Sequence, residues 1–120
     1  MVAMSIGGPS AGAATVDISG AWSGGGAFML ASGSRENAKC RVRYVAQSKT
    51  TFHVDAACAT PSGRVNQTAT VRMDGENSYV GRFVNSEYNV TGSIHITVSG
   101  NVQSVRLNSD AGSASLRLSR

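Results

Sequence analysis

The chain has 120 residues, of which 15% are charged and 14 are glycine, and it carries a net charge of +4. This length suits a single domain. A composition poor in Glu and Lys but rich in small polar residues favours strands and turns over helices. The basic residues are spread along the chain, which argues against a nucleic-acid-binding arm. No apolar run approaches the ~20 residues that a membrane-spanning helix needs, so we expect no membrane span.

Residues 1–15 are uncharged and end in a run of small residues, Ala11-Gly12-Ala13-Ala14. Small residues of this kind are typical of a signal-peptide cleavage site, although a basic start and a full apolar segment are missing. We therefore interpret residues 1–15 as a signal-peptide remnant or a flexible linker. One domain is expected over residues 16–120.

From Val16 onward, apolar and polar residues alternate with a period of two, interrupted by turn residues at the spacing typical of sandwiches and barrels. Consecutive hairpins tend to close on themselves, because closure removes the exposed edges. The pattern predicts an all-β fold, an antiparallel meander of about eight strands closed into a small barrel. A two-sheet sandwich is the alternative.

The first expected strand contains Trp22, and Gly24, Gly25 and Gly26 follow it. A phosphate-binding loop would continue into a helix, whereas residues 27–30 are typical of a strand. We expect the three glycines to form a loop at the barrel mouth, either one that contacts a ligand or partner or a simple flexible turn.

Residues 39–59 form a hairpin when they are folded about Lys49. This register sets Cys40 opposite Cys58 on an apolar face, and Arg43 opposite Asp55 on the other face. Cysteines directly opposite each other on antiparallel strands are close enough for a disulfide after modest local adjustment. The register therefore predicts a Cys40–Cys58 disulfide, and with it an oxidising compartment, periplasmic or secreted.

Residues 65–84 predict a second hairpin, with Val71 opposite Gly81. A glycine facing a branched residue indicates a bend or a close approach of two backbones. The inward positions hold mostly apolar residues, so we expect a filled interior more than a polar lumen. Five aromatic residues fall mostly on inward faces: Tyr44, Phe52, Tyr79, Phe83 and Tyr88.

Residues 88–98 predict the next strand, with Tyr88 on its apolar face. Gly100-Asn101 is typical of a two-residue hairpin turn of type II′, in which glycine supplies the positive φ. Residues 113–119 form the last expected strand.

The segment Gly20-Ala21-Trp22 contains the only tryptophan of the chain. This G-x-W opening resembles that of calycins, the group of lipocalins, avidins, fatty-acid-binding proteins and bacterial metalloprotease inhibitors. In that group the Trp closes one end of the barrel, and a basic residue of the last strand stacks on it as a cation–π contact. The resemblance implies that Trp22 is the plug and Arg117 its partner, with Arg120 as the second choice.

Residues that carry chemistry are few. The only two histidines, His53 and His95, fall on polar strand faces. The two cysteines and these distant histidines make a poor zinc site, and residues 74–77 lack the ligand set of a calcium loop. We expect no catalytic residue, no metal site and no cofactor.

These observations lead to a non-catalytic, exported bacterial binding module, expected to be a monomer that does not bind nucleic acid. Its expected partner is a protein such as a protease, or an anionic glycan. The resemblance to protease inhibitors implies that residues 1–15 would enter a protease cleft. The alternative is a carrier that holds a small apolar ligand inside the barrel. An enzyme of unknown class is the third possibility.

Overall fold

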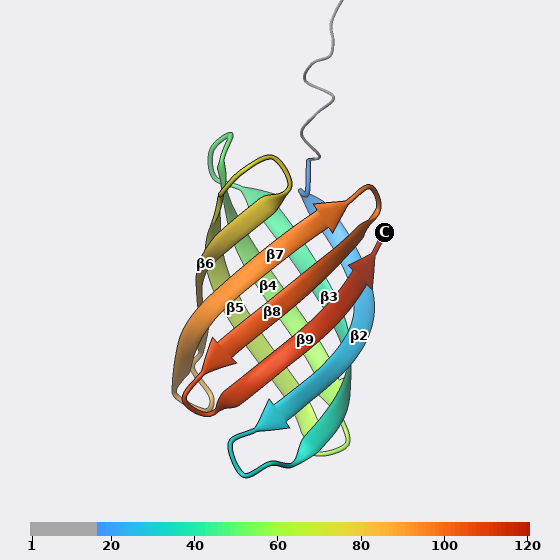
Figure 1. The fold of residues 1–120 in the computed structure, drawn as a ribbon, viewed down its shortest axis with the longest axis vertical. Helices are drawn as coiled ribbons and strands as arrows, with labels where there is room; N and C mark the ends of the chain where they lie inside the picture. The colour runs from blue at the N-terminus through green and yellow to red at the C-terminus, as the bar shows by residue number, and fades with distance from the viewer. Residues whose placement is uncertain (1–16) are drawn as a thin grey trace, which may run out of the picture.

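A computed structural model describes residues 17–120 as a barrel of antiparallel strands (Figure 1). The interpretation of residues 1–15 as a signal-peptide remnant or linker lies outside the described residues. The strands are β2 (Gly20–Leu30), β3 (Arg35–Ala46), β4 (Thr51–Thr60), β5 (Gly63–Met73), β6 (Ser78–Asn85), β7 (Val90–Ser99), β8 (Val102–Ser109) and β9 (Gly112–Ser119).

Each strand pairs with the next one, and β2 also pairs with β9, which closes the barrel. The predicted meander is confirmed, and the sandwich alternative is wrong. We call one end, with the turns of residues 47–50, 74–77 and 100–101, the plugged end; it is uppermost in Figure 1. The opposite end, with the turns of residues 31–34, 61–62, 86–89 and 110–111, is the open end.

The predicted pairings agree with the observed register. Cys40 faces Cys58, and Arg43 faces Asp55. The β5–β6 hairpin has the expected partners, as does the β7–β8 hairpin, which turns through Gly100 with a φ of 60°. Because side chains alternate between the two faces, this register fixes which residues enter the barrel.

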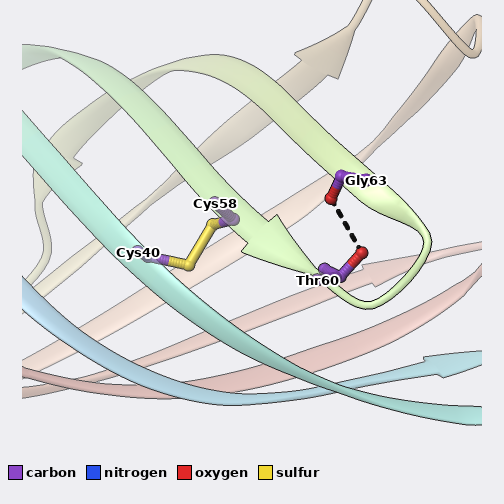
Figure 2. The surroundings of a disulfide bond; sticks show 4 residues. All are labelled: Cys40, Cys58, Thr60 and Gly63. Carbon is purple, nitrogen blue, oxygen red and sulfur yellow. Dashed lines mark hydrogen bonds between the residues drawn. A yellow bond between two sulfur atoms is a disulfide. The ribbon is translucent and has the colours of Figure 1, made fainter.

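The disulfide joins Cys40 of β3 to Cys58 of β4, as predicted (Figure 2). The two Cα atoms are 4.1 Å apart, closer than the ~5.5 Å of a hydrogen-bonded antiparallel pair. Both cysteines are buried and face the interior. Just beyond Cys58, the Thr60 hydroxyl donates a 2.9 Å hydrogen bond to the carbonyl of Gly63, across the β4–β5 turn (Figure 2).

Glycines allow the strands to bend sharply where neighbouring backbones approach each other. A Cβ at Gly81 would lie 1.9 Å from the carbonyl oxygen of Thr70, so the predicted close approach is confirmed. Gly24 and Gly26 approach β9 in the same way. Gly24, Gly25 and Gly26 lie within β2, and the prediction that they form a loop is therefore wrong.

Tyr88 also departs from the prediction. It lies in the turn of residues 86–89, and β7 begins only at Val90. Asn89 closes this turn with a φ of 55°, a left-handed conformation that Asn tolerates better than most residues. Tyr88 is consequently 63% exposed instead of packed in the core.

Candidate ligand-binding site

The plugged end is closed by Trp22, which is 2% exposed. Its indole Nε1 donates a 2.9 Å hydrogen bond to the carbonyl of Ile18. The Arg120 guanidinium lies 4.4 Å from the centre of the indole ring, a cation–π contact. Arg120 also donates hydrogen bonds to the carbonyls of Asp17 and Ser19, which ties the chain end to the start of the barrel.

The basic partner of Trp22 is therefore Arg120, the second choice, and the prediction of Arg117 is wrong. Arg117 lies between the inward residues Leu116 and Leu118 of β9, so its own side chain points outward. Arg120 follows the last residue of β9. Because Arg120 lies outside the strand, its side chain does not have to point either into or out of the barrel, and it reaches over the barrel end to the Trp22 ring.

The half of the barrel next to Trp22 is filled with large side chains. The rings of Phe52 and Tyr79 meet edge to face, with centres 5.6 Å apart. The Tyr44 hydroxyl donates a hydrogen bond to Gln103 Oε1, and both side chains are buried. Burial raises the pKa of the Tyr44 hydroxyl, so this tyrosine stays neutral and able to donate.

Only a small void remains in the middle of the barrel. Its volume is about 20 Å³, and Phe83, Leu107 and Gln67 are among its lining residues. This is room for about one water molecule. The expected filled interior is thus found in this half of the barrel.

The open half is hollow. A cavity of about 480 Å³ begins at Phe83 and Leu107 and reaches the turns at the open end. Ligand pockets typically measure about 300–1,000 Å³. The prediction of a filled interior is therefore wrong for this half. The apolar residues that line the walls are Phe28, Val65, Phe83, Val90, Leu107 and Ala114.

Two amide side chains enter this apolar cavity. Asn85 is buried, and its Oδ1 accepts a 3.2 Å hydrogen bond from the backbone N–H of Tyr88, which holds the turn beside the mouth. Gln67 occupies an inward, half-buried position on β5, and its amide forms no hydrogen bond within residues 17–120. The amide of Gln67 is therefore available to a bound molecule.

Among residues 17–120, Glu36 is the only charged residue that lines the cavity. Its carboxylate lies at the rim and accepts hydrogen bonds from the hydroxyl and the backbone N–H of Ser62. The hydroxyl bond is the main cause that lowers the pKa of Glu36 below its ordinary value. The cavity rim therefore carries a negative charge at neutral pH, and no Lys or Arg of the described part of the chain lines the cavity to oppose it.

Apolar side chains surround the mouth of the cavity. Met29 and Leu30, at the end of β2, are each 44% exposed, and Tyr88 lies on the turn between β6 and β7. These are three of the five large hydrophobic residues exposed on the described part of the chain. The open end thus presents an apolar entrance to an apolar cavity.

The other sequence candidates lie away from this cavity. His53 Nε2 is 3.4 Å from the Asp55 carboxylate, on the outer face of β4. Gly24 and Gly25 border a shallow hollow on the outer wall, and none of Gly24, Gly25 and Gly26 lines the cavity. Residues 17–120 contain no group of three or more potential metal ligands. They also contain no helix long and apolar enough to cross a membrane.

No protein-family model and no curated protein matches the chain. The redesigned β-barrel mFAP1, bound to DFHBI, is 13% identical with a TM-score of 0.73, covering 86% of this chain and 94% of that chain. The redesigned barrel mFAP0, also bound to DFHBI, is 15% identical with a TM-score of 0.71, covering 86% and 98%. A de novo designed, fluorescence-activating β-barrel is 17% identical with a TM-score of 0.66, covering 86% and 93%.

The chain is therefore an eight-strand antiparallel barrel similar in fold to designed barrels, two of which are bound to a small ligand. The likeness to these designed barrels shows the fold alone, and the comparisons match the chain to no natural family. The lining residues of the cavity carried no signal of their own in the sequence. Their alternation predicts that they face inward but does not separate a packed interior from a hollow one.

Proposed function

We propose that this domain binds a small, neutral and mostly apolar ligand in the open half of its barrel. The observation that carries the proposal is the cavity of about 480 Å³, which is walled by apolar side chains and reaches the turns of the open end. Transfer of apolar surface from water into such a site is favourable. This is the carrier alternative that the sequence left open.

The charge of the lining defines the ligand further. An anionic ligand would meet no cationic partner in the cavity and would pass the ionised Glu36 at the rim. Desolvating an unpaired charge is costly, so a neutral ligand fits better than a fatty acid anion. The free amide of Gln67, close to the cavity floor, favours a ligand with one carbonyl or hydroxyl group at its inner end.

The designed barrels support the proposal at the level of architecture. Barrels of the same fold, mFAP1 and mFAP0, are bound to the small molecule DFHBI. Eight strands enclose just enough space for one small ligand when side chains do not fill it. The plugged end of the present barrel would leave a single entrance for that ligand.

We also propose that the domain binds and does not catalyse, and that it acts as a periplasmic or secreted protein. Among residues 17–120, Glu36 is the only charged residue of the cavity, and its carboxylate already accepts a hydrogen bond from the Ser62 hydroxyl. This supports binding over catalysis. The Cys40–Cys58 disulfide supports an oxidising compartment. Inhibition of a protease stays a prediction, because it concerns residues 1–15.

The test is a fluorescence titration with N-phenylnaphthylamine, a neutral apolar probe that brightens in apolar surroundings. Ala114→Phe places a ring inside the cavity, whereas Ser115→Phe places the same ring on the outer face of β9. We expect Ala114→Phe to weaken binding at least about tenfold and Ser115→Phe to change it by less than about twofold. Equal affinities of both variants and the unmodified protein would overturn the proposal.

A second probe tests the charge of the ligand. Anilinonaphthalene sulfonate has nearly the same shape but carries a negative charge. We expect it to bind at least about tenfold more weakly than the neutral probe. Tighter binding of the sulfonate, with loss on Ala114→Phe, would retain the cavity as the site but contradict its preference for neutral ligands.

A further inference from the structure

Charges are segregated on the barrel. Of the seven acidic residues, only Asp55 lies in the middle of a strand; the others lie at the barrel ends or in turns. Basic residues occupy the wall instead. They are densest on β3, where Lys39, Arg41 and Arg43 take alternate positions and face outward. We call these three residues the basic stripe.

The members of the basic stripe have no acidic partner. None of the three forms an ion pair within residues 17–120. Asp55, which the register places opposite Arg43, borders the same hollow; its carboxylate lies 3.4 Å from His53 Nε2 and forms no ion pair with Arg43. Alternate residues of a strand are about 6.8 Å apart, so three unpaired cations follow one another along roughly 14 Å of β3.

The strands on both sides of the basic stripe carry small residues. On β2 these are Ala21, Ser23 and Gly25, and on β4 they are Ala57 and Ala59. Two shallow hollows lie over these residues, one bordered by Lys39 and the other by Arg41 and Arg43. Because these neighbouring side chains are small, the charged groups are accessible to a molecule that lies along β3.

The register adds two further cations beside Lys39. Gly25 of β2 pairs with both Lys39 and Arg117, and Ala59 of β4 pairs with both Lys39 and Arg64. Arg117 and Arg64 therefore flank the stripe, each two strands away from Lys39. Positive charge therefore extends along the outer face of the barrel on both sides of β3, to β9 and to β5.

We propose that the basic stripe is a docking surface for a linear anionic polysaccharide. Unpaired cations at regular intervals complement a polymer with regularly spaced carboxylates, and Arg can bind a carboxylate with two parallel hydrogen bonds. The surface carries no aromatic side chain on which a base would stack, as single-stranded nucleic-acid sites do. The flanking residues on β2 and β4 are small, and the single exposed Val45 that follows Arg43 on β3 offers little apolar surface to insert into a lipid bilayer. The cavity lies at the open end, so this inference is independent of the proposed ligand.

The experiment measures retention on immobilised polygalacturonate at increasing salt concentration. The test variant replaces Lys39, Arg41 and Arg43 by Gln. The control variant replaces Arg72, Arg82 and Arg106 by Gln, which removes the same charge from exposed positions on β5, β6 and β8. We expect the test variant to bind about tenfold more weakly, and the control to change by less than about threefold.

Equal weakening of both variants would overturn the proposal, because only net charge would then matter. Binding of a single-stranded oligonucleotide or of anionic phospholipid vesicles more tightly than polygalacturonate, through the same three residues, would overturn it in favour of another partner. Circular dichroism melting checks that the triple variant is folded. If it is not, the single charge reversal Arg41→Glu serves as the test, and the same loss of retention is expected.

Discussion

Gln67 is the residue that most directly links the structure to a ligand. An unpartnered amide in an apolar cavity gives up part of its hydration without gaining a hydrogen bond. Such a group is a cost to the free protein and a source of selectivity for a ligand that can pair with it. The stability of the barrel and the affinity for a ligand therefore make opposite demands on this position.

The variant Gln67→Leu separates these two effects. We expect it to leave the free energy of unfolding unchanged or to raise it by up to about 1 kcal/mol. It should weaken binding of a carbonyl-bearing probe by about three- to tenfold, the value of one neutral hydrogen bond. Urea unfolding and fluorescence titration measure the two quantities; a large loss of stability would show that the amide has a structural role.

Arg120 contributes to stability in a way that Arg117 does not. It stacks on Trp22 and donates two hydrogen bonds to backbone carbonyls. We expect Arg120→Gln to lower the free energy of unfolding by about 1–2 kcal/mol. Arg117→Gln, the matched control, should change it by less than about 0.5 kcal/mol.

Trp22→Ala should cost more, about 3–5 kcal/mol, since it removes a buried ring. Urea denaturation measures all three variants. A loss below about 1 kcal/mol for Trp22→Ala would mean that the plug contributes little.

At the scale of the strands, the β3–β4 hairpin is held twice, by its backbone ladder and by the disulfide. The bridge closes a sequence separation of 18 residues, for which the chain-entropy model gives roughly 3 kcal/mol. Because Cys40 and Cys58 are already paired across the ladder, we expect a smaller loss. The double variant Cys40→Ala, Cys58→Ala should keep its β-sheet circular dichroism and melt at a lower temperature. Loss of all β-structure would contradict this expectation.

Strand register was predictable from the sequence because side chains alternate between the two faces of a strand with a period of two residues. An error of one residue would have moved Cys40 and Cys58 to opposite faces, so one arrangement alone fitted both the apolar face and the cysteines.

The errors in the sequence prediction arose where a residue type has two structural uses. Gly24–Gly26 favoured a loop, yet glycine also permits the sharp bends of a barrel strand. Tyr88 continues the alternation of β7 but lies in the preceding turn.

At the scale of the whole molecule, the two halves of the barrel differ in what fills them. The plugged half contains Trp22, Phe52 and Tyr79, while smaller residues such as Ala114 and Val65 line the open half. An inward Phe or Leu has the same sequence signature in a packed core and in a cavity wall. The volume depends on which inward residues meet across the barrel, and strand alternation does not contain that information.

We therefore expect the plugged end of the barrel to provide stability and the open end to provide binding. The most direct measurement is a nuclear magnetic resonance titration of the backbone amides with N-phenylnaphthylamine. We expect saturable shifts at cavity residues such as Phe28, Gln67 and Leu107, and unchanged signals around Trp22 and Tyr79. Shifts confined to the outer wall, or no saturable change, would contradict the claim that the open half of the barrel is a ligand site.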